Sequence, residues 1–120
     1  MTYYRKPSYS KYKNEKIVID GHKFDSNAEG QRYLDLKLLE RAGEIKDLRL
    51  QYKFVLQEGY VNHKGKKICP ITYVADFVYY DVKKECTVVE DVKGMLTDVY
   101  KLKKKMFEFR YGIPITEIKH

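Results

Sequence analysis

Apolar residues alternate with polar ones over several short stretches of the chain, and this pattern predicts β-strands. In residues 44–57, Leu48, Leu50 and Tyr52 alternate with charged or polar neighbours, which is typical of a half-buried strand. Residues 73–78 and 88–93 are also strand-like, and the polar residues between them predict a hairpin with its turn near 81–85. Shorter strands are expected on both sides of Asp20-Gly21, a favoured type I′ turn pair, and over residues 113–118.

Two other stretches have the period of amphipathic helices. The first begins at the capping box Ser26-Asn27-Ala28-Glu29 and runs to about Ala42, just before Gly43. The second begins at Leu96 or Thr97 and ends near Tyr111. The expected inward faces are Leu34, Leu38 and Ala42, widened by Tyr33, Leu36 and Leu39, in the first helix, and Val99, Leu102, Met106 and Phe109 in the second.

The order of elements after the N-terminal hairpin is therefore αβββαβ, which predicts an α/β fold. A chain of 120 residues is long enough for one domain with its own core. We expect that domain to span residues 17–120. Residues 1–16 are polar and basic and are interrupted by Pro7, so they predict a flexible arm.

Two acids stand among the apolar residues of the central hairpin. Asp76 lies within 73–78, and Asp91 follows Val88, Val89 and Glu90. A carboxylate buried among apolar side chains costs several kcal/mol unless a positive group meets it, and a divalent cation would be such a group. In an antiparallel hairpin Asp76 lies opposite Glu90 or Asp91, with Cβ atoms about 5 Å apart.

The triplet Asp91-Val92-Lys93 adds a base to the acids. Side chains two apart on a strand point to the same face, so Asp91 and Lys93 point together and Glu90 points away. Oxygen ligands suit Mg²⁺, with Mn²⁺ as a substitute, and a lysine beside them can orient water or stabilise charge on a phosphate. Such a site predicts hydrolysis of a phosphodiester.

At these residues the chain resembles the PD-(D/E)XK nuclease superfamily. Asp76 matches its first acid, Asp91 its second and Lys93 its lysine, although no proline precedes Asp76. The resemblance implies a restriction-endonuclease-like fold with a central mixed sheet and Mg²⁺-dependent cleavage of DNA. It also implies that Glu29 serves as an accessory metal ligand and that the Val92 carbonyl completes the coordination.

Within the superfamily, the stretch VVEDVKG followed by a lysine-rich helix resembles short phage-encoded proteins that are similar to Holliday junction resolvases. This resemblance implies a branched DNA substrate, a role in phage recombination or replication, and a homodimer that presents two sites to two strands. Glu29 has a second interpretation that needs no metal, because the glutamate of a capping box stabilises its helix by itself.

The charge balance favours a polyanionic partner. Lys and Arg number 24 against 17 Asp and Glu, which gives a net charge of +7. Lys101 and Lys105 on the second helix are candidate phosphate contacts, as are Lys64, Lys66 and Lys67 in the segment 58–70. The alternative is that these lysines form an ordinary solvated surface.

The remaining composition narrows the class of protein. Cys69 and Cys86 lack metal-binding spacing, and no signal peptide or apolar run of about 18 residues is present, so we expect a cytoplasmic protein without a membrane partner. If the chain is phage-encoded, the location is the host cytoplasm. Two hypotheses compete with the nuclease. One is an inactive nucleic-acid-binding module of the same fold, and the other is a purely structural, buried ion pair of Asp76 and Asp91 with Lys93 or Arg49.

Overall fold

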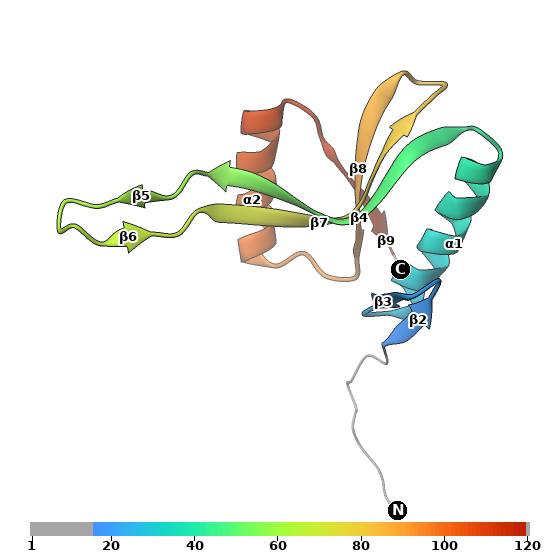
Figure 1. The fold of residues 1–120 in the computed structure, drawn as a ribbon, viewed down its shortest axis with the longest axis horizontal. Helices are drawn as coiled ribbons and strands as arrows, with labels where there is room; N and C mark the ends of the chain where they lie inside the picture. Colours follow the sequence, from blue (N-terminus) through green and yellow to red (C-terminus); the bar gives the residue numbers. More distant parts are fainter. Residues whose placement is uncertain (1–15, 120) are drawn as a thin grey trace, which may run out of the picture. The chain divides into compact units, whose positions relative to one another are not determined.

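The computed structural model describes residues 16–119 (Figure 1). The chain divides into two compact units, one up to Leu38 and one from Leu39 onward, and each is described by itself. Of the predicted arm 1–16, all but Lys16 lies outside the described residues. Whether residues 17–120 act as one domain stays a prediction.

The first unit contains the predicted N-terminal hairpin. Strands β2 (Ile17–Ile19) and β3 (His22–Phe24) pair in an antiparallel manner. Asp20 and Gly21 both have positive φ, at 53° and 81°, as a type I′ turn requires. The turn sequence therefore dictates this hairpin locally.

Helix α1 (Asn27–Arg41) follows the hairpin and begins where the capping box predicts. Its expected inward face is confirmed at Tyr33 and Leu36, which are buried, but is wrong at Leu34 and Leu38, which are exposed. The hairpin explains the difference: Phe24 packs on Tyr33 with ring centroids 5.1 Å apart, and the Tyr33 hydroxyl donates to Asp20 at 2.8 Å. The aromatic contact, rather than the leucine spacing, sets the buried face.

The second unit is a four-stranded mixed sheet with one helix, which confirms the predicted α/β class and the αβββαβ order. The strand order is β4-β7-β8-β9; the β4/β7 and β7/β8 pairs are antiparallel and the β8/β9 pair is parallel. The strands are β4 (Ile45–Gln57), β7 (Ile71–Asp81), β8 (Cys86–Lys93) and β9 (Ile115–Lys119), and helix α2 (Asp98–Tyr111) connects β8 to β9.

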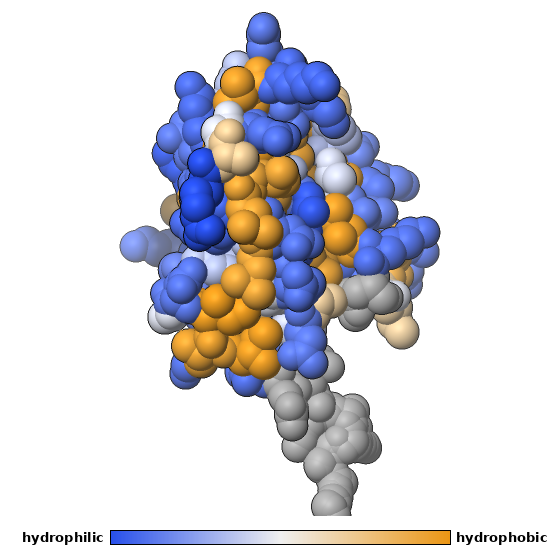
Figure 2. Space-filling view, turned by 90° about the vertical axis from the view of Figure 1, so that its right-hand side faces the viewer, coloured by the Kyte–Doolittle hydropathy of each residue, from blue (hydrophilic) through white to orange (hydrophobic). Residues whose placement is uncertain are grey.

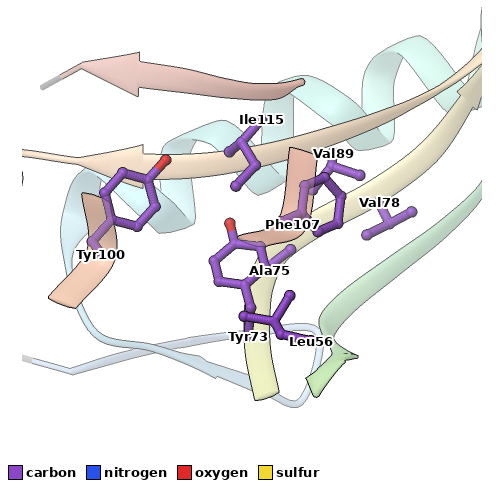
Figure 3. Packing of buried hydrophobic residues seen from close by; sticks show 8 residues of the cluster. All are labelled: Leu56, Tyr73, Ala75, Val78, Val89, Tyr100, Phe107 and Ile115. Atoms are coloured by element: carbon purple, nitrogen blue, oxygen red, sulfur yellow. The ribbon is translucent and has the colours of Figure 1, made fainter. Parts of the chain in front are cut away.

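The core of this unit lies between the sheet and α2 (Figure 3). Phe107 is fully buried at its centre, with ring centroids 5.0 Å from Phe54 and 5.7 Å from Tyr73. The buried cluster consists of Leu56, Tyr73, Ala75, Val78, Val89, Tyr100, Phe107 and Ile115. Ala75 and Val78 both belong to it although they are three residues apart, so the strict alternation expected in this strand is interrupted near Asp76.

Helix α2 has the predicted ends but not the predicted face. The Thr97 hydroxyl accepts from the Tyr100 amide at 3.1 Å, and Gly112 closes the helix with φ 73°. The expected inward stripe is wrong, because Val99, Leu102 and Phe109 are exposed, Phe109 by 93%, and only Met106 is half-buried. Tyr100 and Phe107 are buried instead, since their rings meet the aromatic residues of β4 and β7.

The segment 58–70 contains a small hairpin of β5 (Tyr60–Val61) and β6 (Lys67–Ile68). Figure 1 shows it extending beyond the ends of β4 and β7. The turn is held by Asn62, whose side-chain oxygen accepts from the amides of Lys64 and Lys66 at 2.9 and 3.0 Å. The lysines of this segment therefore stand near the tip of a defined hairpin.

Apolar residues reach the surface among many hydrophilic ones, as Figure 2 shows for one face of the molecule. Within residues 16–119, no helix has the length and apolar character needed to cross a membrane.

Candidate active site

The central hairpin brings the two predicted acids together. Phe77 lies opposite Glu90 in the β7/β8 ladder, and just beyond this pair the side chains of Asp76 and Asp91 contact each other. Asp91, rather than Glu90, is therefore the acid that meets Asp76. The Val92 amide also donates to Asp76 Oδ2 at 2.8 Å, which ties the first acid to the strand that carries the second.

Asp91 is only 3% exposed, yet it carries two polar contacts on one oxygen. The Tyr73 hydroxyl donates to Asp91 Oδ2 at 2.6 Å, and Lys93 Nζ lies 3.4 Å from the same atom. Burial and the neighbouring Asp76 carboxyl raise the pKa of Asp91 to about 7, although Tyr73 and Lys93 act in the opposite direction. The Asp91 carboxyl therefore keeps its proton to a higher pH than an exposed aspartate does.

Lys93 is fixed by a second group of side chains. Its ammonium lies 4.3 Å from the centroid of the Tyr100 ring, a cation–π contact. The Tyr100 hydroxyl donates to Glu117 Oε2 at 2.8 Å, and Lys104 Nζ lies 2.9 Å from that oxygen. These two hydrogen bonds lower the pKa of Glu117. Helix α2 and strand β9 thus hold Lys93 in place beside Asp91.

Gln51 is a site residue that the sequence pattern does not reveal. It lies opposite Asp76 in the β4/β7 ladder, between the pairs Leu50/Phe77 and Tyr52/Ala75, and its side-chain amide is 3.4 Å from Asp76 Oδ1. Its φ of 50° is uncommon for a residue other than glycine. In the sequence it stands on the polar side of a strand, where solvated residues are usual.

Tyr73 and Tyr100 are also missed by the sequence. Tyr73 is one of the apolar residues of a strand-like stretch, and Tyr100 lies outside the stripe expected to face inward. Each is buried through its ring and directs its hydroxyl to a carboxylate. Burial and the hydrogen bond to Asp91 raise the pKa of Tyr73, and burial and the bond to Glu117 raise that of Tyr100. Both hydroxyls therefore remain proton donors at neutral pH. Only the strand register and the packing of α2 reveal these roles.

Glu29 belongs to the first unit. It is buried, and its amide donates to Ser26 Oγ at 3.1 Å, as the capping box predicts. Its role as an accessory metal ligand stays a prediction, as does the proposed ligation by the Val92 carbonyl.

Comparison with protein families assigns the chain to a family. A family model described as a protein of unknown function, DUF1064, matches residues 9–118. The chain belongs to the DUF1064 family. It matches no curated protein and no solved structure. The matched region includes every predicted site residue, but this family assignment leaves the resemblance to PD-(D/E)XK nucleases a prediction.

The lysines that we expect to contact DNA are exposed in this DUF1064 protein. Lys101 and Lys105 lie on the solvent side of α2, whereas their neighbour Lys104 is tied to Glu117. Lys64, Lys66 and Lys67 are exposed around the β5/β6 turn. Their positions fit both phosphate binding and a solvated surface, so their role stays a prediction.

The donor set of the DUF1064 protein fits a hard divalent cation that keeps part of its ligands as water or substrate. Among residues 16–119, no three His, Cys, Asp or Glu side chains gather closely enough to form a metal cage. The hairpin does bring two carboxylates together, and Mg²⁺ is commonly held by one or two carboxylates with waters and substrate phosphates. A cation here would lower the pKa of Asp91, opposing the effects of burial and of the Asp76 carboxyl. Cys69 and Cys86 are free, exposed thiols.

Proposed function

We propose that this chain is a metal-dependent DNA endonuclease of the PD-(D/E)XK type. The observation that supports it most is the close arrangement of Asp76, Asp91 and Lys93 on the β7/β8 hairpin. Two ionised carboxylates in contact repel each other, which destabilises the fold unless a cation binds between them. Lys93 lies beside one of their oxygens, Asp91 Oδ2. The exposed basic residues of α2 and the β5/β6 hairpin agree with a polyanionic substrate.

In this proposal Asp76 and Asp91 would hold Mg²⁺, or Mn²⁺ in its place, and the Val92 carbonyl and Glu29 would be the further ligands that the resemblance implies. When bound, such an ion lowers the pKa of a water and neutralises charge on the phosphate. Tyr73 and the Val92 amide orient the two carboxylates, each through a hydrogen bond to one oxygen. The other oxygen of the first acid, Asp76 Oδ1, lies 3.4 Å from the side-chain amide of Gln51.

Lys93 positions the attacking water and stabilises the charge that develops on the phosphate in the transition state. Its partly exposed side chain can reach substrate, and the Tyr100 ring limits the rotamers that it samples. The Lys104–Glu117 pair keeps Tyr100 in place from the far side. The lysine is thus positioned by residues that take no part in the chemistry.

The substrate class rests on the resemblance and on charge. A branched DNA such as a Holliday junction, cut by a homodimer in the host cytoplasm during phage recombination or replication, is the substrate and setting that we propose. Lys101, Lys105 and the lysines of the β5/β6 hairpin would bind its phosphates. Each contact of this kind steepens the dependence of log affinity on log salt by about 0.9.

A second candidate is a DNA-binding module that performs no chemistry. The ion pair between Lys93 and Asp91 favours this candidate, because a 3.4 Å contact can be purely structural. The raised pKa of Asp91 favours the enzyme, because strongly shifted pKa values are common at functional sites. An acid in a purely structural ion pair is expected to stay ionised. Cleavage measurements separate the two.

The test uses labelled four-way junction, linear duplex and single-stranded DNA with Mg²⁺, Mn²⁺ or EDTA. The native chain is compared with Asp91→Asn and with Asp25→Asn, a surface acid that pairs only loosely with Lys16 at 3.8 Å. We expect metal-dependent nicking of the junction by the native chain and Asp25→Asn, and none by Asp91→Asn. Binding without cleavage under every condition would leave the non-enzymatic module.

A further inference from the structure

A cleft of about 300 Å³ lies in the second unit, apart from the residues that we assign to catalysis. It is formed along β4 and β7 and reaches Thr87 at the start of β8. Aromatic rings dominate its walls. The lining consists of Asp47, Arg49, Tyr52, Phe54, Val78, Tyr79, Tyr80 and Thr87.

Two tyrosine rings of this cleft make cation–π contacts with basic side chains. Arg49 lies 5.6 Å from the centroid of the Tyr52 ring, and Lys46 lies 5.2 Å from that of Tyr80. Tyr52 packs edge-on against Phe54 at 4.9 Å and remains exposed at its outer side. An accessible ring beside a guanidinium is the surface on which proteins stack unpaired nucleobases, while the cations meet the adjoining phosphates.

The backbone of β4 is irregular at two points, one on each side of Arg49. Asp47 has φ 58° and Gln51 has φ 50°, and the pairing with β7 shifts by one residue between Lys46 and Arg49. Such irregularities redirect side chains and are retained where the surrounding structure holds them. Asp47 lines the cleft and Gln51 contacts Asp76, so strand β4 contributes residues to both the cleft and the candidate active site.

We propose that this cleft binds one unstacked base of the DNA strand that is presented to Asp76, Asp91 and Lys93. Tyr52 stacks on the base, Arg49 and Lys46 meet its phosphates, and the Asp47 carboxylate accepts from an exocyclic amine. The volume suits a single nucleotide rather than a duplex, whose bases are stacked inside the helix. This inference rests on the proposed nuclease function and gives a physical source for selectivity toward DNA with unpaired bases.

Binding is measured in the Asp91→Asn background with EDTA, so that cleavage plays no part. The probes are a fluorescent single-stranded oligonucleotide that carries 2-aminopurine and a fully paired duplex of the same sequence. Tyr52→Ala is compared with Tyr52→Phe, which keeps the ring, and with Lys53→Ala, an exposed neighbour outside the cleft. Thermal unfolding confirms that each variant is folded.

We expect Tyr52→Ala to weaken single-strand binding by roughly 5- to 150-fold, with a smaller effect on duplex, and to abolish the fluorescence quenching of 2-aminopurine. Tyr52→Phe should bind as the parent does. Arg49→Ala should also flatten the salt dependence of log affinity by about one phosphate contact, whereas Tyr52→Ala should not.

Equal weakening for duplex and single strand would overturn the proposal, because stacking on an unpaired base would not then be involved. Unchanged binding in Tyr52→Ala would overturn it as well, while leaving a nuclease that cuts junctions intact. Conversely, Tyr52-dependent quenching in a chain that cleaves no DNA would support the cleft and reject the nuclease.

Discussion

Two neighbouring carboxylates on β8 face opposite sides of the sheet. Glu90 is 1% exposed and receives a hydrogen bond from the Tyr79 hydroxyl. Asp91 is 3% exposed and receives one from the Tyr73 hydroxyl, but it also lies beside Lys93 and a second carboxyl, Asp76. Both acids are buried and both contact a tyrosine, so burial alone does not separate a structural acid from a chemical one.

The two acids differ in their charged and polar neighbours. Burial and the neighbouring Asp76 carboxyl together raise the pKa of Asp91 to about 7, a value at which the group changes charge under ordinary conditions. We therefore propose that the cation binds on the face of β8 that holds Asp91. We assign the face that holds Glu90 to the stability of the sheet.

The largest expected effect comes from replacing Asp91 or Glu90, one at a time, with its amide. Asp91→Asn should lower metal-dependent cleavage at least about a hundredfold, because a metal contributes several kcal/mol to such reactions. Glu90→Gln should leave cleavage by the folded protein intact while lowering the free energy of unfolding by about 1 to 3 kcal/mol. Cleavage rates and urea unfolding measure the two effects, and a reversal of this pattern would contradict the comparison.

Lys93→Ala should have the next largest effect. Removing the ammonium should reduce the rate of cleavage by about 10- to 100-fold, since a charged donor near the transition state is lost. Affinity for Mn²⁺ should stay the same or rise, because the competing cation beside Asp91 is gone. Lys103→Ala, on the same lysine-rich helix, is the control, and single-turnover rates at saturating metal give the measurement.

The pH dependence of stability should differ between the native chain and Asp91→Asn in the absence of metal. The folded pKa of Asp91, about 7, is higher than its ordinary value of 3.8, so the native state binds more protons than the unfolded state between these values. Stability from this group is complete below pH 4 and is lost as the pH rises toward 7. Subtracting the Asp91→Asn profile from the native one should give this fall, and a flat difference would contradict the assigned charge state.

Tyr73→Phe should produce the smallest effect. The hydroxyl donates to Asp91 and lowers its pKa, so its removal should move the rising limb of the cleavage profile to higher pH. The cost in stability should be about 1 kcal/mol. Rates measured across pH at saturating metal test this shift, with Tyr79→Phe on the other face as the matched control. A change of the same size in both variants would remove the distinction between the faces.

Local chemistry explains why the elements themselves could be predicted. Nearby residues determine the turn at Asp20 and Gly21, where φ is positive. They also determine the helix caps at Ser26 and Thr97 and the helix end at Gly112. The buried faces of the helices could be predicted only in part from periodicity, because they depend on the surface that each helix meets. Helix α2 buries Tyr100 and Phe107 since rings from β4 and β7 are there to receive them.

The candidate site was predictable only along the hairpin. A turn near 81–85 is enough to bring Asp76 toward Asp91, and alternation separates Glu90 from Lys93. Gln51, Tyr73 and Tyr100 depend on the β4/β7 register or on helix packing, which join residues that are distant in sequence. Their roles therefore need the tertiary structure.

Calorimetric titration of Mn²⁺ into the native chain, Asp91→Asn and Glu90→Gln tests the central claim most directly, with DNA present in a non-cleavable form. The account predicts saturable binding to the native chain and to folded Glu90→Gln, with release of protons that grows as the pH falls below 7, and loss of that binding in Asp91→Asn. Equal binding by all three chains, or none by the native chain, would contradict a metal site at Asp76 and Asp91.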